Sequence, residues 1–180
     1  MVLEQLLALD SSIVLFLVGV RTPALDLFFR AATLIGSIYF LSLIGLALIS
    51  KNRKAGINFF MGFAVNLGIM FLLKQAVHRP RPFETLPEIT ALDDENTSSF
   101  PSGHTAGAFY GAAFLSEFYK KFSGVFYFLG LLVFISRIYL GVHYSSDALA
   151  GAVIGFFLGK IFAKFDYEKF IRKFFRQKKF

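Results

Sequence analysis

Long apolar stretches occupy most of this sequence and restrict what it can fold into. A helix needs about 20 mostly apolar residues to cross the hydrocarbon core of a bilayer. Five windows meet that length, at residues 31–50, 55–74, 101–119, 122–142 and 144–163. Hydrophobic residues make up 56% of the chain and the mean hydropathy is +0.61, outside the usual range of soluble proteins. The sequence therefore predicts one all-α domain over residues 1–180, a polytopic membrane helix bundle with five transmembrane helices.

Residues 1–22 are a weaker candidate for a sixth helix. Glu4, Asp10, Ser11 and Ser12 interrupt the apolar pattern, and the apolar run that remains covers only residues 13–20. That run is too short to cross a bilayer upright. We expect an N-terminal interfacial segment here, with a short or tilted sixth span as the alternative.

Two of the windows carry a glycine at every fourth position. These glycines are Gly103, Gly107 and Gly111 in the third window and Gly151, Gly155 and Gly159 in the fifth. A stripe of small residues on one helix face lets two helix backbones approach closely in a membrane. The spacing predicts close helix packing along both windows.

Basic residues predict how the bundle is oriented. Lys51, Arg53 and Lys54 lie between the first two windows, Lys120 and Lys121 lie between the third and fourth, and eight more basic residues follow from position 160 onwards. Lysine and arginine concentrate on the cytoplasmic side of membrane proteins, so these three segments are expected there. Residues 75–100 then form an extracytoplasmic loop. Residues 164–180 form a basic cytoplasmic tail, either a helix on anionic lipid or a solvated charged segment.

Three polar clusters fall at the extracytoplasmic ends of different windows. The clusters read KQAVHRPRP at residues 74–82, PSGH at residues 101–104 and SRIYLGVHYSSD at residues 136–147. Lys74, Arg81 and Arg137 supply three cations, while Ser102 and Gly103 at a helix start supply a hydroxyl and free backbone N–H groups. Cations and a helix N-terminus are what a phosphate oxyanion needs. We therefore expect the clusters to form a phosphate site.

The same clusters contain the groups needed for phosphoryl transfer. Asp147 follows His143 by four residues, so its carboxylate could hold one ring nitrogen as N–H and leave the other as a nucleophile. His104 could protonate the departing group and then take a proton from water. The chain has no cysteine, which excludes a thiolate nucleophile and a thiolate metal site.

Several of these residues also have purely structural explanations. Lys74 and Arg79, at the end of a window, could extend to the lipid headgroups, and Ser102 could be a helix cap. Arg137 is harder to explain in this way, because it lies inside an apolar window, where a charge costs about 2.5–3.5 kcal/mol on insertion scales. If all of these residues were purely structural, three unrelated polar clusters would lie at the same membrane face by chance.

The order and spacing of the clusters resemble the three-part signature of the type-2 phosphatidic acid phosphatase family. The matching residues are Lys74 with six residues before Arg81-Pro82, then Pro101-Ser102-Gly103-His104, then Ser136-Arg137 with five residues before His143 and three more before Asp147. The resemblance covers residues 74–147. It implies a membrane-embedded, all-helical protein, usually with six spans, that needs no divalent metal or other cofactor. The amino end departs from that pattern, since the first expected span is short and polar.

The resemblance also implies a role for each matching residue. His143 would be the nucleophile that becomes phosphorylated, Asp147 its orienting partner, and His104 the general acid and then the general base. The phosphoryl group would be bound by Lys74, Arg81, Ser102, Gly103 and Arg137.

The function implied is a membrane lipid phosphatase of the bacterial cytoplasmic (inner) membrane, acting at its extracytoplasmic face. Lipid A 1-phosphate or undecaprenyl diphosphate is the favoured substrate, and phosphatidylglycerophosphate or phosphatidic acid is the alternative. The expected partners are the phosphorylated lipid and membrane lipids, with no nucleic acid and no obligate protein partner. A non-catalytic protein that binds or transports lipid phosphates is the alternative of another class. Vanadium haloperoxidases resemble the same motifs, but they are soluble, and the apolar windows argue against them.

Overall fold

The computed structural model describes residues 2–167, and every regular element within that range is a helix. The helices are α1 (Val2–Gly19), α2 (Pro23–Thr33), η1 (Leu34–Gly36), α3 (Ile38–Lys51), α4 (Arg53–Val77), α5 (Pro82–Thr85), α6 (Gly103–Phe118), η2 (Lys120–Phe122), α7 (Ser123–Tyr139) and α8 (Ser145–Ala163). The expected all-α bundle is confirmed.

Polar side chains at the helix starts set several of these boundaries. Thr22, Ser37, Asn52 and Ser102 each accept a hydrogen bond from a backbone N–H in the first turn of the helix that follows. Such caps satisfy N–H groups that have no partner within the helix. At the other end of α4, His78 adopts a left-handed conformation with φ 49°, and this ends the helix.

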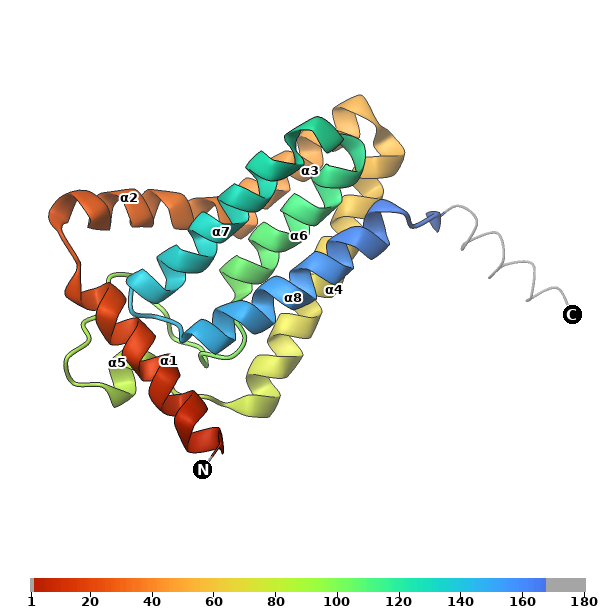
Figure 1. Ribbon diagram of the computed structural model, residues 1–180. Helices are drawn as coiled ribbons and strands as arrows, with labels where there is room; N and C mark the ends of the chain where they lie inside the picture. The colour runs from red at the N-terminus through yellow and green to blue at the C-terminus, as the bar shows by residue number, and fades with distance from the viewer. Residues whose placement is uncertain (1, 168–180) are drawn as a thin grey trace, which may run out of the picture.

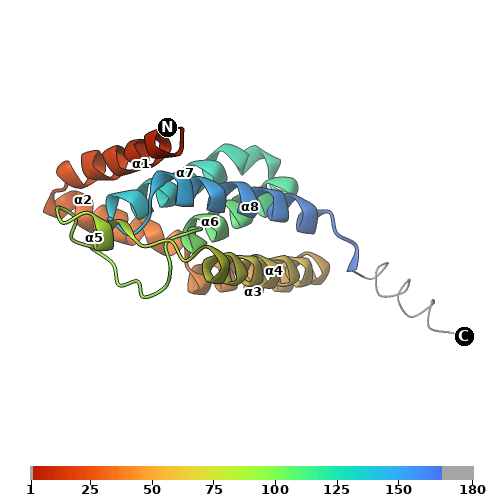
Figure 2. The same cartoon turned by 90° about the horizontal axis from the view of Figure 1, so that it is seen from below.

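Helix α6 lies in the middle of the bundle. It packs against α7 and α8 on one side and against α3 and α4 on the other, so the long helices form three layers (Figure 2). Helix α1 lies on the outside of the α7 and α8 layer (Figure 2). This central position gives α6 ten buried residues out of 16.

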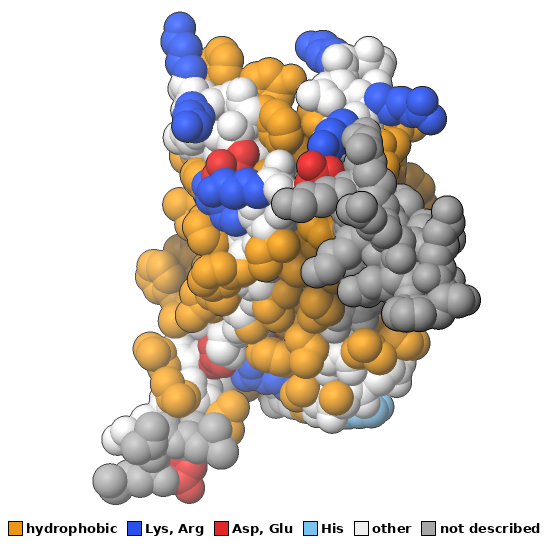
Figure 3. Space-filling view, turned by 90° about the vertical axis from the view of Figure 1, so that its right-hand side faces the viewer, with side chains coloured by type: hydrophobic (Ala, Val, Ile, Leu, Met, Phe, Trp, Pro, Cys, Tyr) orange, Lys and Arg blue, Asp and Glu red, His pale blue; other side chains and the backbone are white. Residues whose placement is uncertain are grey.

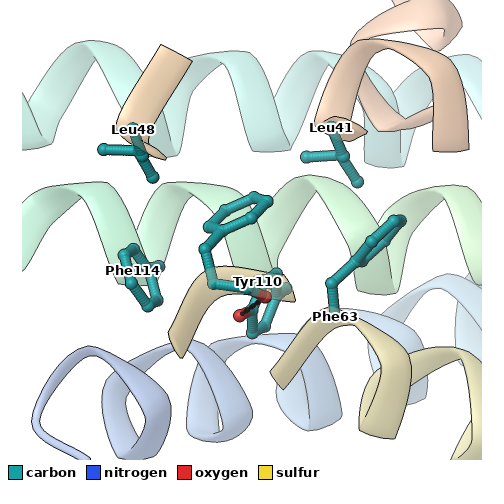
Figure 4. Packing of buried hydrophobic residues seen from close by; sticks show 6 residues of the cluster. Leu41, Leu48, Phe63, Tyr110 and Phe114 are labelled. Atoms are coloured by element: carbon teal, nitrogen blue, oxygen red, sulfur yellow. Dashed lines mark hydrogen bonds between the residues drawn. The ribbon is translucent and has the colours of Figure 1, made fainter. Parts of the chain in front are cut away.

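An aromatic cluster fills the space between α3, α4 and α6 (Figure 4). Phe59, Tyr110 and Phe114 are fully buried in it, and Leu41 and Leu48 close it from α3. The Tyr110 hydroxyl donates a 2.6 Å hydrogen bond to the backbone oxygen of Phe59, so the one polar group of these rings is satisfied. Aromatic packing therefore joins the middle layer to one outer layer.

Glycines join α6 to the other outer layer. A Cβ atom at Gly155 would clash with the carbonyl oxygen of Ala106, and one at Gly151 would clash with that of Ser102. The fifth window therefore packs backbone against backbone on α6, as predicted. The glycines of the third window face elsewhere, since a Cβ at Gly107 would meet Leu41 and Gly36.

Two of the five predicted windows take a form that the sequence did not suggest. The first is broken into α2, η1 and α3, with a bend of 47° at Ser37. The third is only the 16 residues of α6. Three helical segments are long and apolar enough to cross a membrane, at Arg53–Thr85, Lys120–Tyr139 and Ser145–Ala163, and the bent pair makes a fourth if it is one span, all within the described residues. The protein is thus an integral membrane protein.

The predicted N-terminal segment is a continuous helix. Within α1, Val14 is fully buried and Asp10 is only 6% exposed, although both lie in a segment that we expected at the membrane interface. Helix α1 contacts α7 and α8, so it packs against the bundle.

The two ends of the bundle differ in charge. The α3–α4 and α6–α7 connections lie at one end, and the segment between α4 and α6 lies at the other, together with the α7–α8 connection (Figure 1). Figure 3 shows Lys and Arg side chains gathered toward one end of the molecule above a broad belt of hydrophobic side chains. In the tail predicted over residues 164–180, only residues 164–167 lie within the described part of the chain.

Candidate active site

The three sequence clusters meet at the end of the bundle that lacks the basic connections. Lys74 lies in the last turn of α4, His104 in the first turn of α6 and Arg137 in the last turn of α7. Arg81 precedes α5, and His143 lies between α7 and α8. The antiparallel course of these helices brings together residues that are distant in sequence.

Arg81 is fully buried and is held by backbone oxygens. Its Nε donates to the Thr97 oxygen at 2.6 Å, and its Nη1 donates to the Val142 oxygen at 2.8 Å. The same Nη1 lies 3.5 Å from Nε2 of His143. These contacts fix the guanidinium next to one histidine and leave Nη2 directed at a carboxylate.

Arg137 is also fully buried, and its partners are mostly acidic. Nη1 donates to Thr33 Oγ1 at 2.8 Å and to Asp93 Oδ2 at 2.6 Å. Nη2 donates to Glu95 Oε1 at 2.6 Å. Burial favours the neutral acid of Asp93, but the hydrogen bond and the charge of Arg137 outweigh it and lower the pKa of this carboxyl group.

The carboxylate of Glu95 joins the two arginines. Its Oε1 accepts from Arg137, its Oε2 accepts from Arg81 at 2.8 Å, and Oε1 also lies 3.9 Å from Nδ1 of His104. The two guanidinium groups and one histidine thus surround a single oxyanion. Two guanidinium groups can hold a carboxylate or the oxygens of a phosphoryl group.

The two ring nitrogens of His143 face different neighbours. Nδ1 lies 3.8 Å from Oδ2 of Asp147, while Nε2 points to Arg81. That Nδ1–Oδ2 distance is too long for a hydrogen bond, and Oδ2 accepts from the Tyr144 N–H and the Ser99 hydroxyl instead. Burial, reinforced by the charges of Arg137 and Arg81, lowers the pKa of His143 to about 3, so its imidazole is neutral at pH 7. A neutral imidazole with one free nitrogen can act as a nucleophile.

The remaining predicted phosphate ligands lie at the same end of the bundle. Ser102 is buried and caps α6, with its hydroxyl 3.0 Å from that of Thr105. Gly103 opens that helix, and a Cβ there would meet no atom within 4 Å, so the space beside it is open. The Lys74 ammonium donates to the Ser98 carbonyl oxygen. In this structure the Lys74 side chain is therefore bound to the segment between α5 and α6.

Five residues in this region were missed as members of the site. Asp93 and Glu95 were assigned only to the extracytoplasmic loop at residues 75–100, and Thr33 carried no signal at all. Arg79 was explained as an interfacial residue, yet it donates to Asp147 Oδ1 at 2.6 Å and to Asp10 Oδ2 at 2.9 Å. Asp10 itself, a carboxylate that interrupts the apolar pattern of residues 1–22, was the available signal. Within residues 2–167 no group of three or more His, Asp or Glu side chains could hold a metal ion.

Comparison with known proteins agrees with this geometry. Residues 55–171, which include all three clusters, match the PAP2 superfamily. The chain belongs to the PAP2 superfamily. The resemblance inferred from the motifs is therefore confirmed, and the PAP2 fold accounts for the meeting of the clusters at one end of a helical bundle.

Individual PAP2 relatives have several different names. Lipid A 4'-phosphatase of Bacteroides thetaiotaomicron is 31% identical over 179 residues, covering 89% of this chain and 78% of that protein. Undecaprenyl-diphosphatase BcrC of Bacillus subtilis is 31% identical over 120 residues, covering 64% and 60%. The crystal structure of Aquifex aeolicus LpxE has a TM-score of 0.80 at 30% identity, covering 86% and 94%. The matches to BcrC and to a Bacillus licheniformis relative span only 60% and 53% of those proteins.

Proposed function

We propose that this protein is a membrane lipid phosphatase that hydrolyses a phosphate monoester or diphosphate of a bacterial envelope lipid. The observation that carries the proposal is the convergence of Arg81 and Arg137 on one carboxylate that is flanked by His104, with His143 beside Arg81. An anion held there would have a nucleophilic nitrogen and a proton donor within reach.

The proposed reaction has two steps. Nε2 of His143 attacks phosphorus, the bond from phosphorus to the lipid oxygen breaks, and protonated His104 gives its proton to the departing oxygen. Water then attacks the phosphohistidine, the P–N bond breaks, His104 takes a proton from that water, and inorganic phosphate leaves. Arg81, Arg137, Lys74, Ser102 and the backbone N–H groups at Gly103 stabilise the charge on the phosphoryl oxygens. These cations take the role that a metal has in other phosphatases, so we propose a metal-independent reaction.

The proposed substrates are lipid A phosphate and undecaprenyl diphosphate. Both names occur among the PAP2 relatives, as lipid A 4'-phosphatase and undecaprenyl-diphosphatase. Lipid A 1-phosphate is proposed from the resemblance to the family alone, because the lipid A relative is named for the 4'-phosphate. Phosphatidylglycerophosphate and phosphatidic acid are the other substrates to test. We place the protein in the inner membrane with the site on the extracytoplasmic side, opposite the basic connections.

The test measures phosphate release by the purified protein in detergent with chelator present. The panel contains lipid A, undecaprenyl diphosphate, phosphatidylglycerophosphate and phosphatidic acid. His143→Ala is expected to lower kcat by roughly 1,000-fold or more, because the covalent route is lost. The matched control is His78→Asn, which removes an exposed histidine and keeps a residue type that tolerates φ 49°.

Two results would contradict the proposal. Substantial turnover by His143→Ala would exclude His143 as the nucleophile. A folded wild-type protein that binds these lipids and releases phosphate from none would indicate the binding or transport protein instead.

A further inference from the structure

Asp147 is held on the side away from His143 by Arg79. Its Oδ1 accepts from Nη1 of Arg79 at 2.6 Å, whereas Oδ2 faces Nδ1 of His143. Asp147 is fully buried. A buried carboxylate that lost one of its hydrogen-bond donors would keep an unsatisfied oxygen and would turn toward another donor.

Arg79 is in turn fixed by α1 and by an aromatic ring. Its Nη2 donates to Oδ2 of Asp10 at 2.9 Å, and its guanidinium carbon lies 4.0 Å from the centre of the Tyr144 ring. The hydroxyl of Ser146 accepts a 2.7 Å hydrogen bond from Nη1. Three neighbours therefore fix the plane of this guanidinium, and the plane determines where it meets Asp147.

Asp10 also holds the first turn of α8, the turn that carries Asp147. Its Oδ1 accepts from the Ser146 N–H at 2.9 Å and from the Ser145 hydroxyl, and its Oδ2 accepts from the Ser146 hydroxyl. An acidic side chain at a helix N-terminus satisfies free N–H groups and interacts favourably with the helix dipole. Asp10 thus reaches Asp147 by two routes, through Arg79 and through the backbone of α8.

From these contacts we infer that Arg79 and Asp10 are positioning residues for His143 and act on it through Asp147. Neither contacts the anion site formed by Arg81, Arg137 and His104. The chain of contacts runs from Asp10 to Arg79, from Arg79 to Asp147 and from Asp147 to the imidazole that must keep Nε2 unprotonated and aimed at phosphorus. This inference rests on the proposed function, because it assigns His143 the role of nucleophile.

A purely structural role is the competing explanation, in which Asp10 and Arg79 only attach α1 to the bundle. The two explanations differ in what the variants change. A positioning pair affects kcat and leaves the affinity for substrate almost unchanged, whereas a structural pair affects stability only. Lys160 and Glu117 form a comparable part-buried ion pair, with N–O 2.6 Å, at the other end of the bundle. Lys160→Ala is therefore the matched control for losing such a pair.

The experiment compares kcat, KM and melting temperature for Arg79→Ala, Arg79→Lys, Asp10→Asn and the double variant Asp10→Asn with Arg79→Ala. We expect Arg79→Ala to lower kcat by about 10- to 100-fold with KM within about twofold. The kcat of Arg79→Lys should lie between those of Arg79→Ala and the wild type. Asp10→Asn should lower kcat less, and its effect should shrink when Arg79 is already alanine.

Added guanidinium gives a second readout. A cavity of about 610 Å³ is lined by Asp10, Arg79 and Ser146 together with apolar residues, so a small cation can enter where the arginine side chain was. Guanidinium should raise the kcat of Arg79→Ala and leave that of the wild type and Lys160→Ala unchanged.

The outcomes are separable from those of the proposed function. If the wild type releases phosphate and His143→Ala does not, the proposed function stands and the Arg79 variants decide this inference alone. Wild-type kcat in Arg79→Ala would overturn it, as would a loss of kcat that guanidinium and lysine both fail to restore. If Arg79→Ala does not fold, Asp10→Asn is the variant that tests the inference. An unchanged kcat in Asp10→Asn would then overturn it.

Discussion

His143 is a histidine that the fold keeps neutral. It is buried next to two arginines, and its ordinary pKa of 6.5 is lowered to about 3. The unfolded chain has no such environment, so it binds a proton at His143 over a pH range in which the folded protein does not. Such a difference makes stability depend on pH.

Acid is therefore expected to destabilise the protein through His143. Between about pH 6.5 and pH 3 the unfolded state binds the extra proton, so the free energy of unfolding falls as the pH falls. The melting temperature in detergent should drop between about pH 7 and about pH 5, and the drop should be smaller in His143→Gln, which binds no proton. His78→Asn should keep the wild-type dependence. Equal slopes in the wild type and His143→Gln would show that His143 does not contribute.

At the scale of elements, the segment between α5 and α6 places a carboxylate in the anion site. Glu95 accepts from Arg81 and Arg137, and Asp93 accepts from Arg137. Two buried cations would otherwise be unpaired at great cost. In the proposed phosphatase, a phosphoryl group that bound both arginines would have to replace Glu95.

Glu95→Gln is expected to strengthen phosphate binding, because the amide leaves the arginines without a competing negative charge. The dissociation constant of inorganic phosphate, measured by isothermal titration calorimetry on the detergent-solubilised protein, should fall by roughly 3- to 10-fold. Glu88→Gln, at an exposed position of the same segment, is the control. Weaker phosphate binding in Glu95→Gln would mean that the carboxylate organises the arginines rather than competing for them.

Helix packing gives a second prediction at this scale. A Cβ atom at Gly155 would collide with the Ala106 carbonyl oxygen, which cannot move without shifting α6. Gly155→Ala should therefore cost about 1–3 kcal/mol, seen as a lower melting temperature. Gly68→Ala, where the added carbon would meet nothing within 4 Å, should not lower it. If Gly155→Ala melts at the wild-type temperature, α6 and α8 are not packed as closely as described.

At the scale of the whole molecule, the two ends of the bundle differ in which charged residues they carry. The anion site lies at the end opposite the α3–α4 and α6–α7 connections, which carry lysines and Arg53. Large apolar side chains such as Phe71, Leu131 and Phe157 are exposed between the ends, as a surface in contact with lipid requires.

The absence of cysteine makes the orientation directly measurable. Glu88→Cys, in the segment at the site end, should react in intact cells with a membrane-impermeant maleimide. Lys120→Cys, in the α6–α7 connection, should react only after the membrane is opened, because basic connections face the cytoplasm. The reverse pattern would place the site on the cytoplasmic side.

The sequence by itself determined the class of fold and predicted which basic residues and histidines would meet at one end of the bundle. Apolar length is a property of the chain, so the helical windows could be read directly. The motifs pointed to Lys74, Arg81, His104, Arg137 and His143, which the structure brings to the same end of the bundle. The apolar windows predicted helix length less well for a helix that other helices surround. Helix α6 needs only 16 residues, because it lies in the middle of the bundle. At the break before Ser37, Gly36 comes so close to the backbone of His104 that a Cβ atom would not fit, a tertiary contact that the apolar window does not reveal.

Only the tertiary structure decided what holds these residues in place. Glu95 meets Arg137 across 42 positions, and Arg79 meets Asp10 across 69. No local spacing encodes such contacts, because they depend on how the helices pack. A buried charge is stable only with a partner. A charged residue in an apolar segment therefore predicts that a partner exists, but the packing of the helices determines which residue it is. The sequence shows that Asp10 needs a partner, and only the structure shows that this partner is Arg79.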